Sequence, residues 1–227
     1  MKPIIFTLTG PSCAGKTTLE KLLVEKHGFS NVISDTTRPI RAGEVDGVNY
    51  YYRTEAEFNN VKELGLLIES VTYGGYQYGI SLDEVNRVTA TGKVIVAVVE
   101  PNGREQIKKY ANKAKFYFVP IFISNPANII AQRYMRRIID GAITLDPFAL
   151  KRYEEFLQTS SSRLADMMTV EAAWVQEAKS VLNPYILVFH NFNETNQEYV
   201  LKRIDDYAKM LIGNRDQAES EKENKAL

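Results

Sequence analysis

The chain has 227 residues, of which 44% are hydrophobic, enough for one large packed domain or for a domain with an inserted subdomain. Its 28 basic and 28 acidic residues balance, so no overall positive field attracts a polyanion, and we expect neither a nucleic-acid nor a membrane partner. No apolar run is long enough to cross a bilayer, the first residues lack signal-peptide features, and the single cysteine, Cys13, cannot form an internal disulfide. These features predict a cytoplasmic protein.

Residues 10–17 read Gly-Pro-Ser-Cys-Ala-Gly-Lys-Thr and match the pattern GxxxxGK[ST] at every required position. An apolar run, residues 4–8, precedes them and a helical pattern follows, which predicts a strand-loop-helix unit whose N–H groups bind a triphosphate. Lys16 is expected to reach the β- and γ-phosphates, and the Thr17 hydroxyl to ligate Mg²⁺. The alternative is a glycine turn with an exposed lysine. The expected nucleotide contacts are Gly10, Ser12, Cys13, Ala14, Gly15, Lys16, Thr17 and Thr18.

Strand-like runs at residues 4–9, 94–99, 116–123 and 185–189 alternate with helical patterns, which predicts an α/β fold with a parallel central sheet. The continuous run of Val, Ile and Ala at 94–99 suits a central strand covered on both faces. Because proline has no N–H to donate, Pro120 is expected at the start or edge of a strand.

Residues 34–92 interrupt this alternation with a segment rich in turns and tyrosines, which we interpret as an inserted lobe opposite the phosphate loop. Two capping boxes, Thr54 with Glu57 and Ser81 with Glu84, predict short helices within it. Arg38 and Arg41 lie three residues apart and near Tyr50, a combination that can hold one phosphate through paired N–H groups and a hydroxyl. The alternative is an exposed basic loop.

The last third of the chain is expected to be mostly helical. Asn125-Pro126 and Asp146-Pro147 resemble helix starts, the second opening a long helical region that ends near Asn183-Pro184. Thr195 is a candidate cap for a final helix ending at Gly213. Residues 214–227 carry one large apolar residue and no aromatic one, so we expect a disordered tail.

Three segments in the expected order closely resemble the guanylate kinase family: residues 34–50, residues 68–79, and a strand leading to Glu100-Pro-Asn-Gly103. The resemblance implies a three-layer αβα fold of the P-loop type, with a core at 1–33 and 93–213, a nucleoside monophosphate-binding insert at 34–92 and a helical lid at about 133–152. It also implies that Arg38, Arg41, Tyr50 and Tyr78 bind the GMP phosphate. By the same resemblance, Ser34, Glu69 and Glu100 face the base.

Guanine presents adjacent N1–H and N2–H₂ donors that a carboxylate can accept, whereas adenine offers no such pair. Glu69 and Glu100 are therefore suitable acceptors, and a buried carboxylate left unpaired would disfavour adenine. Two positions depart from the family pattern. Ile80 stands where a hydroxyl residue usually helps to read the base, and Val98 stands where an aspartate is common near the metal.

The arginines in Arg133-Tyr-Met-Arg136-Arg137 and Lys151-Arg152 resemble the lid of these kinases, in which arginines stabilise charge on the transferring phosphoryl group. We select Arg137 and Arg152, with Arg133 third. Because the stretch between them is longer than usual, Arg163 is a substitute for Arg152. The alternative is a solvated arginine-rich helix face.

These observations together predict an enzyme that uses ATP and Mg²⁺ to phosphorylate GMP or dGMP, with Lys16, Arg41, Arg137 and Arg152 as catalytic residues. The expected partners are these small molecules, and the protein is a monomer or a homodimer. Two alternatives stay open: a kinase of the same fold with a different base specificity, and a non-catalytic binding module.

Overall fold

The computed structural model describes residues 2–41, 43–143, 150–180, 185, 187–190 and 193–226. The strands are β1 (Ile4–Thr9), β2 (Ser30–Asn31), β3 (Asp35–Thr36), β4 (Tyr51–Tyr52), β5 (Leu67–Tyr73), β6 (Tyr76–Ser81), β7 (Ile95–Val98), β8 (Tyr117–Ser124) and β9 (Leu187–His190). The helices are α1 (Lys16–His27), α2 (Glu55–Glu63), α3 (Leu82–Thr89), α4 (Pro101–Ala114), α5 (Ala127–Ile143), α6 (Leu150–Met168), α7 (Val170–Lys179) and α8 (Glu194–Ala226).

The central sheet has the order β2-β7-β1-β8-β9, and every neighbouring pair is parallel. Its four longer strands are those predicted from the apolar runs, so the predicted α/β class with a parallel sheet is confirmed. The edge strand β2 was not predicted, because two partly exposed residues carry no apolar pattern.

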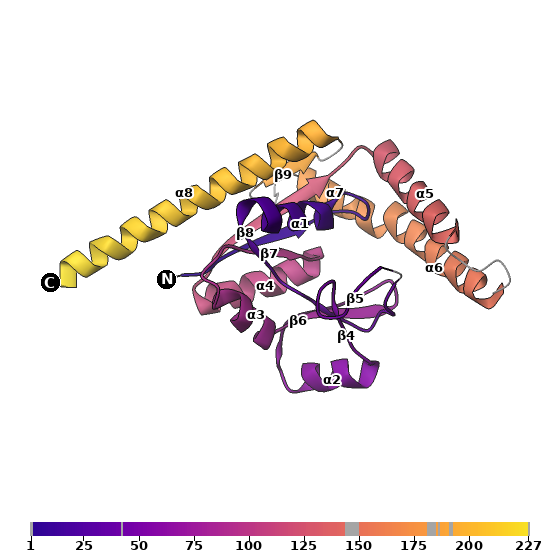
Figure 1. The fold of residues 1–227 in the computed structure, drawn as a ribbon, viewed down its shortest axis with the longest axis horizontal. Coiled ribbons are helices and arrows are strands. Elements are labelled where there is room, and N and C mark those ends of the chain that lie inside the picture. Colours follow the sequence, from indigo (N-terminus) through magenta and orange to yellow (C-terminus); the bar gives the residue numbers. More distant parts are fainter. Residues whose placement is uncertain are drawn as a thin grey trace.

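Helices cover both faces of this sheet (Figure 1). Side chains at alternating positions of β1 point to opposite faces of the sheet. Ile4, Phe6 and Leu8 pack on one face, in the cluster that includes residues of α1 and α8. Ile5, from the opposite face, packs with residues of α3 and α4. The three-layer αβα arrangement therefore follows from the two-residue period of a central strand.

The segment at residues 34–92 builds a second, four-stranded sheet in the order β4-β3-β6-β5, to the side of the core (Figure 1). Thr54 and Glu57 form the complete predicted capping box at the start of α2. The second predicted box is only half formed. Ser81 Oγ accepts from the Glu84 N–H (3.2 Å), but the Glu84 carboxylate accepts from the Ile33 N–H (2.7 Å) and from Arg87 instead.

Pro120 contradicts its predicted place at a strand start or edge. It lies within β8, between β1 and β9, and aligns with Thr7 of β1. Among the described residues, pairing between β8 and β9 runs from Ile121, aligned with Leu187. The missing N–H is tolerated because Pro120 precedes the paired stretch on that side.

The helices after β8 differ from the predicted pattern in extent. Helix α5 begins after Asn125-Pro126, as predicted, and α5 and α6 run side by side away from the core (Figure 1). The long helical region is interrupted at Thr169, which separates α6 from α7. Asp146-Pro147 and Asn183-Pro184, the predicted ends of this region, lie outside the described residues.

Helix α8 corrects two further predictions. Its first turn is capped by Asn193, whose Oδ1 accepts from the Asn196 N–H (2.8 Å), and not by Thr195. The helix also continues past Gly213 to Ala226, so the tail predicted to be disordered is helical. Arg215 within this stretch is buried, and the residues beyond it are mostly good helix formers with no proline to end the helix. In the part of the chain that the structure describes, no helix combines the length and the apolar character that crossing a bilayer requires.

Candidate functional site

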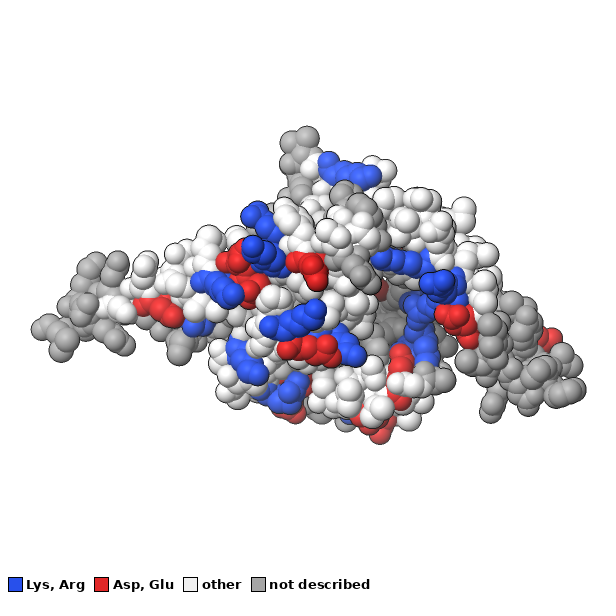
Figure 2. Space-filling view, turned by 45° about the horizontal axis from the view of Figure 1, so that its top comes forward, with Lys and Arg blue, Asp and Glu red and all other residues white. Residues whose placement is uncertain are grey.

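A cavity of about 480 Å³ brings the phosphate loop, the inserted lobe and the lid arginines together. Basic side chains gather beside a hollow in the molecular surface, with acidic side chains close by (Figure 2). Of the predicted nucleotide contacts, all but Ala14 line the cavity: Gly10, Ser12, Cys13, Gly15, Lys16, Thr17 and Thr18. The predicted substrate contacts all line it as well: Ser34, Arg38, Arg41, Tyr50, Glu69, Tyr78 and Glu100.

The phosphate loop needs its two glycines for different reasons. Gly10 has a φ of 147°, and a Cβ there would lie 1.9 Å from the Ile123 carbonyl oxygen of the neighbouring strand β8. Gly15 has a φ of 91° and caps α1. Ala14 is fully buried beneath the loop, where its carbonyl accepts from Asn125 Nδ2 (3.0 Å). The loop therefore packs tightly against β8 and points its open side at the cavity.

The Lys16 ammonium group lies folded along the loop. It donates to the carbonyl oxygens of Gly10 (2.6 Å) and Pro11 (2.9 Å). Burial lowers the pKa of Lys16 to about 8, and the nearby Glu171 carboxylate opposes that shift. A triphosphate would supply further negative charge and would favour the protonated form.

A network of side chains holds Arg38 in place at the far side of the cavity. Its guanidinium donates to Glu44 Oε1 (2.9 Å) and to the Pro39 carbonyl (2.8 Å), and it lies over the rings of Tyr50 and Tyr52 at 5.2 and 5.7 Å. Hydrogen bonds from Arg38 and Tyr52 lower the pKa of Glu44 to about 2, against the effect of burial. Glu44 is thus an ionised anchor for this arginine.

Arg41 lies where positive charges accumulate. Its pKa is lowered to about 10, first by burial and then by the charges of Arg38, Arg137 and Arg163, with a smaller opposing effect of Glu44. Such convergence disfavours each cation until an anion arrives. The geometry at Arg41 therefore suits a bound phosphate.

Two carboxyl groups lie near each other at the opposite end of the cavity. Glu69 is 3% exposed, and its Oε2 has no hydrogen-bond partner among the described residues. Burial, together with the charge of Glu100, raises the pKa of Glu69 to about 8. Burial raises the pKa of Glu100 to about 7, although Lys16 opposes this. An unsatisfied buried carboxyl oxygen is costly, so this site is suited to a ligand with hydrogen-bond donors.

The position of Glu69 depends on close packing between β5 and α4. Ser70 and Gln106 exchange hydrogen bonds of 3.1 Å, N–H to Oε1 and Nε2–H to the carbonyl oxygen, which fix the strand against the helix. Gly103 leaves room for the carboxyl group, because a Cβ there would lie 2.8 Å from Glu69 Oε2. The absence of a side chain at Gly103 therefore helps to define this end of the cavity.

The two departures from the family pattern have clear structural consequences. Ile80 is buried in the core with Val85 and Ile95, and Ser81 caps α3, so neither of them lines the cavity. Val98 does line it and contributes an apolar surface. Among the described lining residues, the carboxylates of Glu69 and Glu100 and the hydroxyl of Ser34 are therefore the groups predicted to face a base.

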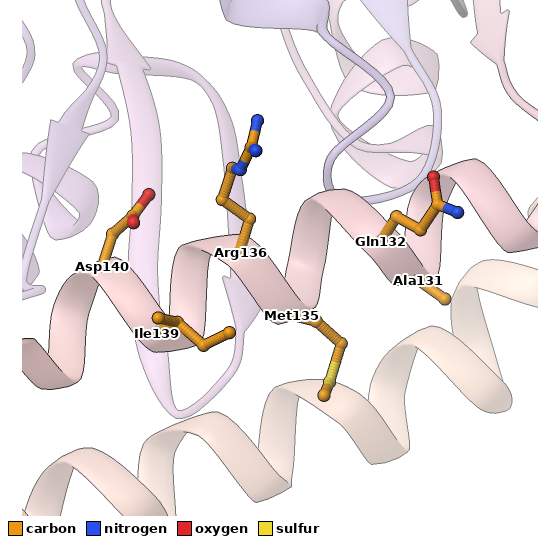
Figure 3. A pocket seen from close by; sticks show the side chains of 6 residues that line it. All are labelled: Ala131, Gln132, Met135, Arg136, Ile139 and Asp140. Carbon is orange, nitrogen blue, oxygen red and sulfur yellow. The ribbon is translucent and has the colours of Figure 1, made fainter.

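The arginines of the lid region differ in where they lie. Arg137 and Arg163 line the cavity, and Arg133 donates to the Cys13 carbonyl (3.1 Å) of the phosphate loop. Arg136 lines a different cavity of about 420 Å³ with Met135 and Ile139, on a stretch of α5 outside the main site (Figure 3). The side chain of Arg152 lies outside what the structure describes.

Several lining residues were not predicted from the sequence, among them Glu20, Tyr73, Glu171 and Trp174. Glu20 had a detectable signal, because it follows Lys16 by four residues and therefore lies on the same face of α1. Burial raises the pKa of Glu20 to about 8. Glu171 had no detectable signal in the sequence, because it lies 159 residues from Ser12, with which it forms hydrogen bonds.

The donor groups near Thr17 bear on metal binding. In the described residues, no group of three or more His, Cys, Asp or Glu side chains is arranged to hold a metal ion. A nucleotide-bound Mg²⁺ keeps several waters and takes one or two protein oxygens, so a single hydroxyl such as that of Thr17 fits this mode of binding.

The parallel sheet, the glycine loop before α1 and the inserted lobe define a P-loop protein of the α/β class, in which Arg38 and Arg41 line the same cavity as the loop. The family model for guanylate kinase matches residues 1–145. The chain belongs to the guanylate kinase family.

Three relatives illustrate the similarity. A guanylate kinase of Enterococcus faecalis is 38% identical over 118 residues, 51% of this chain and 58% of that protein. One of Helicobacter pylori is 33% identical over 153 residues, 66% of this chain and 72% of that protein. The crystal structure of guanylate kinase from Anaplasma phagocytophilum matches with a TM-score of 0.54 at 20% identity, over 92% of this chain and 85% of that one. The chain thus spans less than two thirds of the Enterococcus relative.

Proposed function

We propose that the protein is a guanylate kinase, which transfers the γ-phosphoryl group of ATP to the phosphate of GMP or dGMP. The phosphate loop holds ATP, the insert at residues 34–92 holds the acceptor, and the region at about 133–152 acts as a lid. One observation carries the proposal: the phosphate loop, the Arg38 and Arg41 pair and the buried Glu69 carboxyl line one cavity. Membership of the family supports the same reaction.

Phosphoryl transfer asks the protein mainly for orientation and charge stabilisation. Lys16 leaves the carbonyls of Gly10 and Pro11 to bind the β- and γ-phosphates. Arg41, with Arg38 and Tyr50, orients the acceptor phosphate, whose oxygen is already anionic and needs no strong base. Arg137 then stabilises charge on the transferring group. Arg152 is proposed as the second lid arginine, and Arg163, which lines the cavity, as its substitute.

Mg²⁺, when bound to the nucleotide, neutralises phosphate charge, and the Thr17 hydroxyl is its proposed protein ligand. Selection of the base rests on Glu69 and Glu100. Guanine supplies adjacent N1–H and N2–H₂ donors, which satisfy the orphaned Glu69 Oε2, whereas adenine leaves it unpaired. Because Ile80 is buried in the core, no hydroxyl at that position shares this task, which favours altered base selection as the second candidate.

A coupled assay with ATP and GMP, dGMP, AMP, CMP, UMP or dTMP tests the proposal. We expect GMP and dGMP to be preferred by at least about a hundredfold, the discrimination typical of a site whose polar groups must be paired. A preference for a base without the two guanine donors would support the second candidate and reject the roles of Glu69 and Glu100. No turnover of any acceptor would support the binding module instead.

A further inference from the structure

Glu171 joins three parts of the molecule through one buried carboxylate. Its Oε2 accepts from the Ser12 backbone N–H (2.8 Å), and its Oε1 accepts from Ser12 Oγ (2.7 Å) and from the Tyr73 hydroxyl (2.6 Å). Glu171 itself is 2% exposed and belongs to the first turn of α7. We call these contacts the Glu171 bridge. It connects α7, the phosphate loop and the tip of the β5–β6 hairpin, which belongs to the inserted lobe.

The bridge places a negative charge on the loop whose purpose is to bind phosphate. Ser12 precedes Lys16 in that loop, and both residues line the cavity. The Glu171 charge also acts on the Lys16 ammonium group, which donates to Gly10 and Pro11 within the loop. Two hydrogen bonds from Ser12 and one from Tyr73 hold this carboxylate in place beside the loop. Glu171 therefore supplies an anion to this loop from within the chain.

We propose that Glu171 is an internal anion that occupies the Ser12 end of the phosphate loop until the donor nucleotide displaces it. Two anions cannot share the same N–H group and the same lysine without strong repulsion. A triphosphate entering the loop must therefore break the contact with Ser12. Because Tyr73 is held by the same carboxylate, this event also releases the hairpin of the inserted lobe. The inference rests on the proposed use of this loop for ATP.

Fluorescence of a tryptophan next to the Glu171 bridge can report the release of the hairpin. Trp174, the single tryptophan, follows Glu171 by three residues on α7, and its ring lies 6.2 Å from the ring of Tyr73. The Arg163 guanidinium lies over the same Tyr73 ring at 5.7 Å. Movement of the hairpin away from α7 changes the surroundings of Trp174 and hence its fluorescence.

Trp174 fluorescence during titration with a non-hydrolysable ATP analogue and Mg²⁺ tests the proposal without requiring turnover. Glu171→Gln removes the charge but keeps the shape, and we expect the analogue Kd to fall by about five- to tenfold, within the usual range of coupling between two binding events. Glu177→Gln, the same change on the same helix at a 42% exposed carboxylate, is the control and should leave the Kd within about twofold of the wild type.

Tyr73→Phe provides an independent variant that removes only one hydroxyl. It should change the Trp174 emission of the free protein and lower the analogue Kd less than Glu171→Gln does, because the carboxylate stays on Ser12. An unchanged or raised Kd in a folded Glu171→Gln protein would overturn the inference while leaving the kinase proposal intact. Failure of the wild type and of every variant to bind the analogue, together with no turnover in the acceptor panel, would overturn both proposals.

Discussion

Replacing Gly103 by alanine should damage guanine binding without damaging the fold. The added Cβ would lie 2.8 Å from Glu69 Oε2 and 3.4 Å from its Cδ, so the carboxyl oxygen must move by about 0.6 Å to reach the 3.4 Å of ordinary contact. Glu69 has little room to retreat, since it is 3% exposed and its strand is fixed to α4 through Ser70 and Gln106. The substitution therefore displaces the carboxyl group that is proposed to pair with guanine.

The expected size of the effect follows from the contact that is lost. Hydrogen bonds to a charged group contribute about 1.5–3 kcal/mol, so the KM for GMP should rise by about ten- to a hundredfold. The KM for ATP should change little, because the phosphate loop is untouched. Alanine is also the better helix former by about 0.8–1 kcal/mol, which offsets part of any strain in the free energy of unfolding.

Steady-state kinetics with each substrate varied in turn, together with urea unfolding, check this prediction. Gly213→Ala is the matched control, because it makes the same change within α8, where a Cβ meets nothing within 4 Å. That variant should gain stability and keep both KM values. An unchanged KM for GMP in Gly103→Ala would refute the proposed pairing of Glu69 with the base.

Three further predictions concern charge and backbone. GMP affinity should increase from pH 6 to 8.5, because the raised pKa values of Glu69 (about 8) and Glu100 (about 7) keep these groups neutral at low pH, whereas the guanine donors need the ionised form. Calorimetry in two buffers should detect proton release when GMP binds, and equal proton release by Glu69→Gln would contradict this prediction. Arg41→Met should raise the KM for GMP and lower kcat, together about a hundredfold in kcat/KM, and wild-type kinetics would place the acceptor elsewhere. Gly10→Ala should lower the free energy of unfolding measured in urea by about 3 kcal/mol or more, because the added Cβ would lie 1.9 Å from the Ile123 carbonyl oxygen. The control Gly28→Ala, also at positive φ but in open space, should lower it by about 1 kcal/mol. Equal losses would show that the collision at Gly10 is unimportant.

The part of the fold that could be predicted is the part encoded locally. The phosphate loop, the apolar strands and the complete capping box at Thr54 each leave a short-range pattern that the structure reproduces. Strand β2 is too short to show a pattern, and no local pattern indicated that Pro120 lies inside β8, where the described pairing with β9 starts one residue later. The helix past Gly213 was missed because one glycine without a following proline does not end a helix of good formers.

The residues of the candidate site likewise fall into those that the sequence predicted and those that it did not. Lys16, Arg41 and Glu69 were found because motif and resemblance fix them by position in the sequence. Glu171 and Tyr73 were not, because their contact spans 98 residues and depends on how α7 packs against the inserted lobe. The positions of cavity residues named by a motif were therefore predictable, whereas the long-range contact of Glu171 with Ser12 and Tyr73 was not.

A crystal structure of the protein with GMP tests the central claim most directly. We predict that the acceptor phosphate contacts the side chains of Arg38 and Arg41, and that guanine N1–H and N2–H₂ donate to the carboxylates of Glu69 and Glu100. GMP bound with its phosphate away from these arginines, or with its base away from Glu69, would contradict the account.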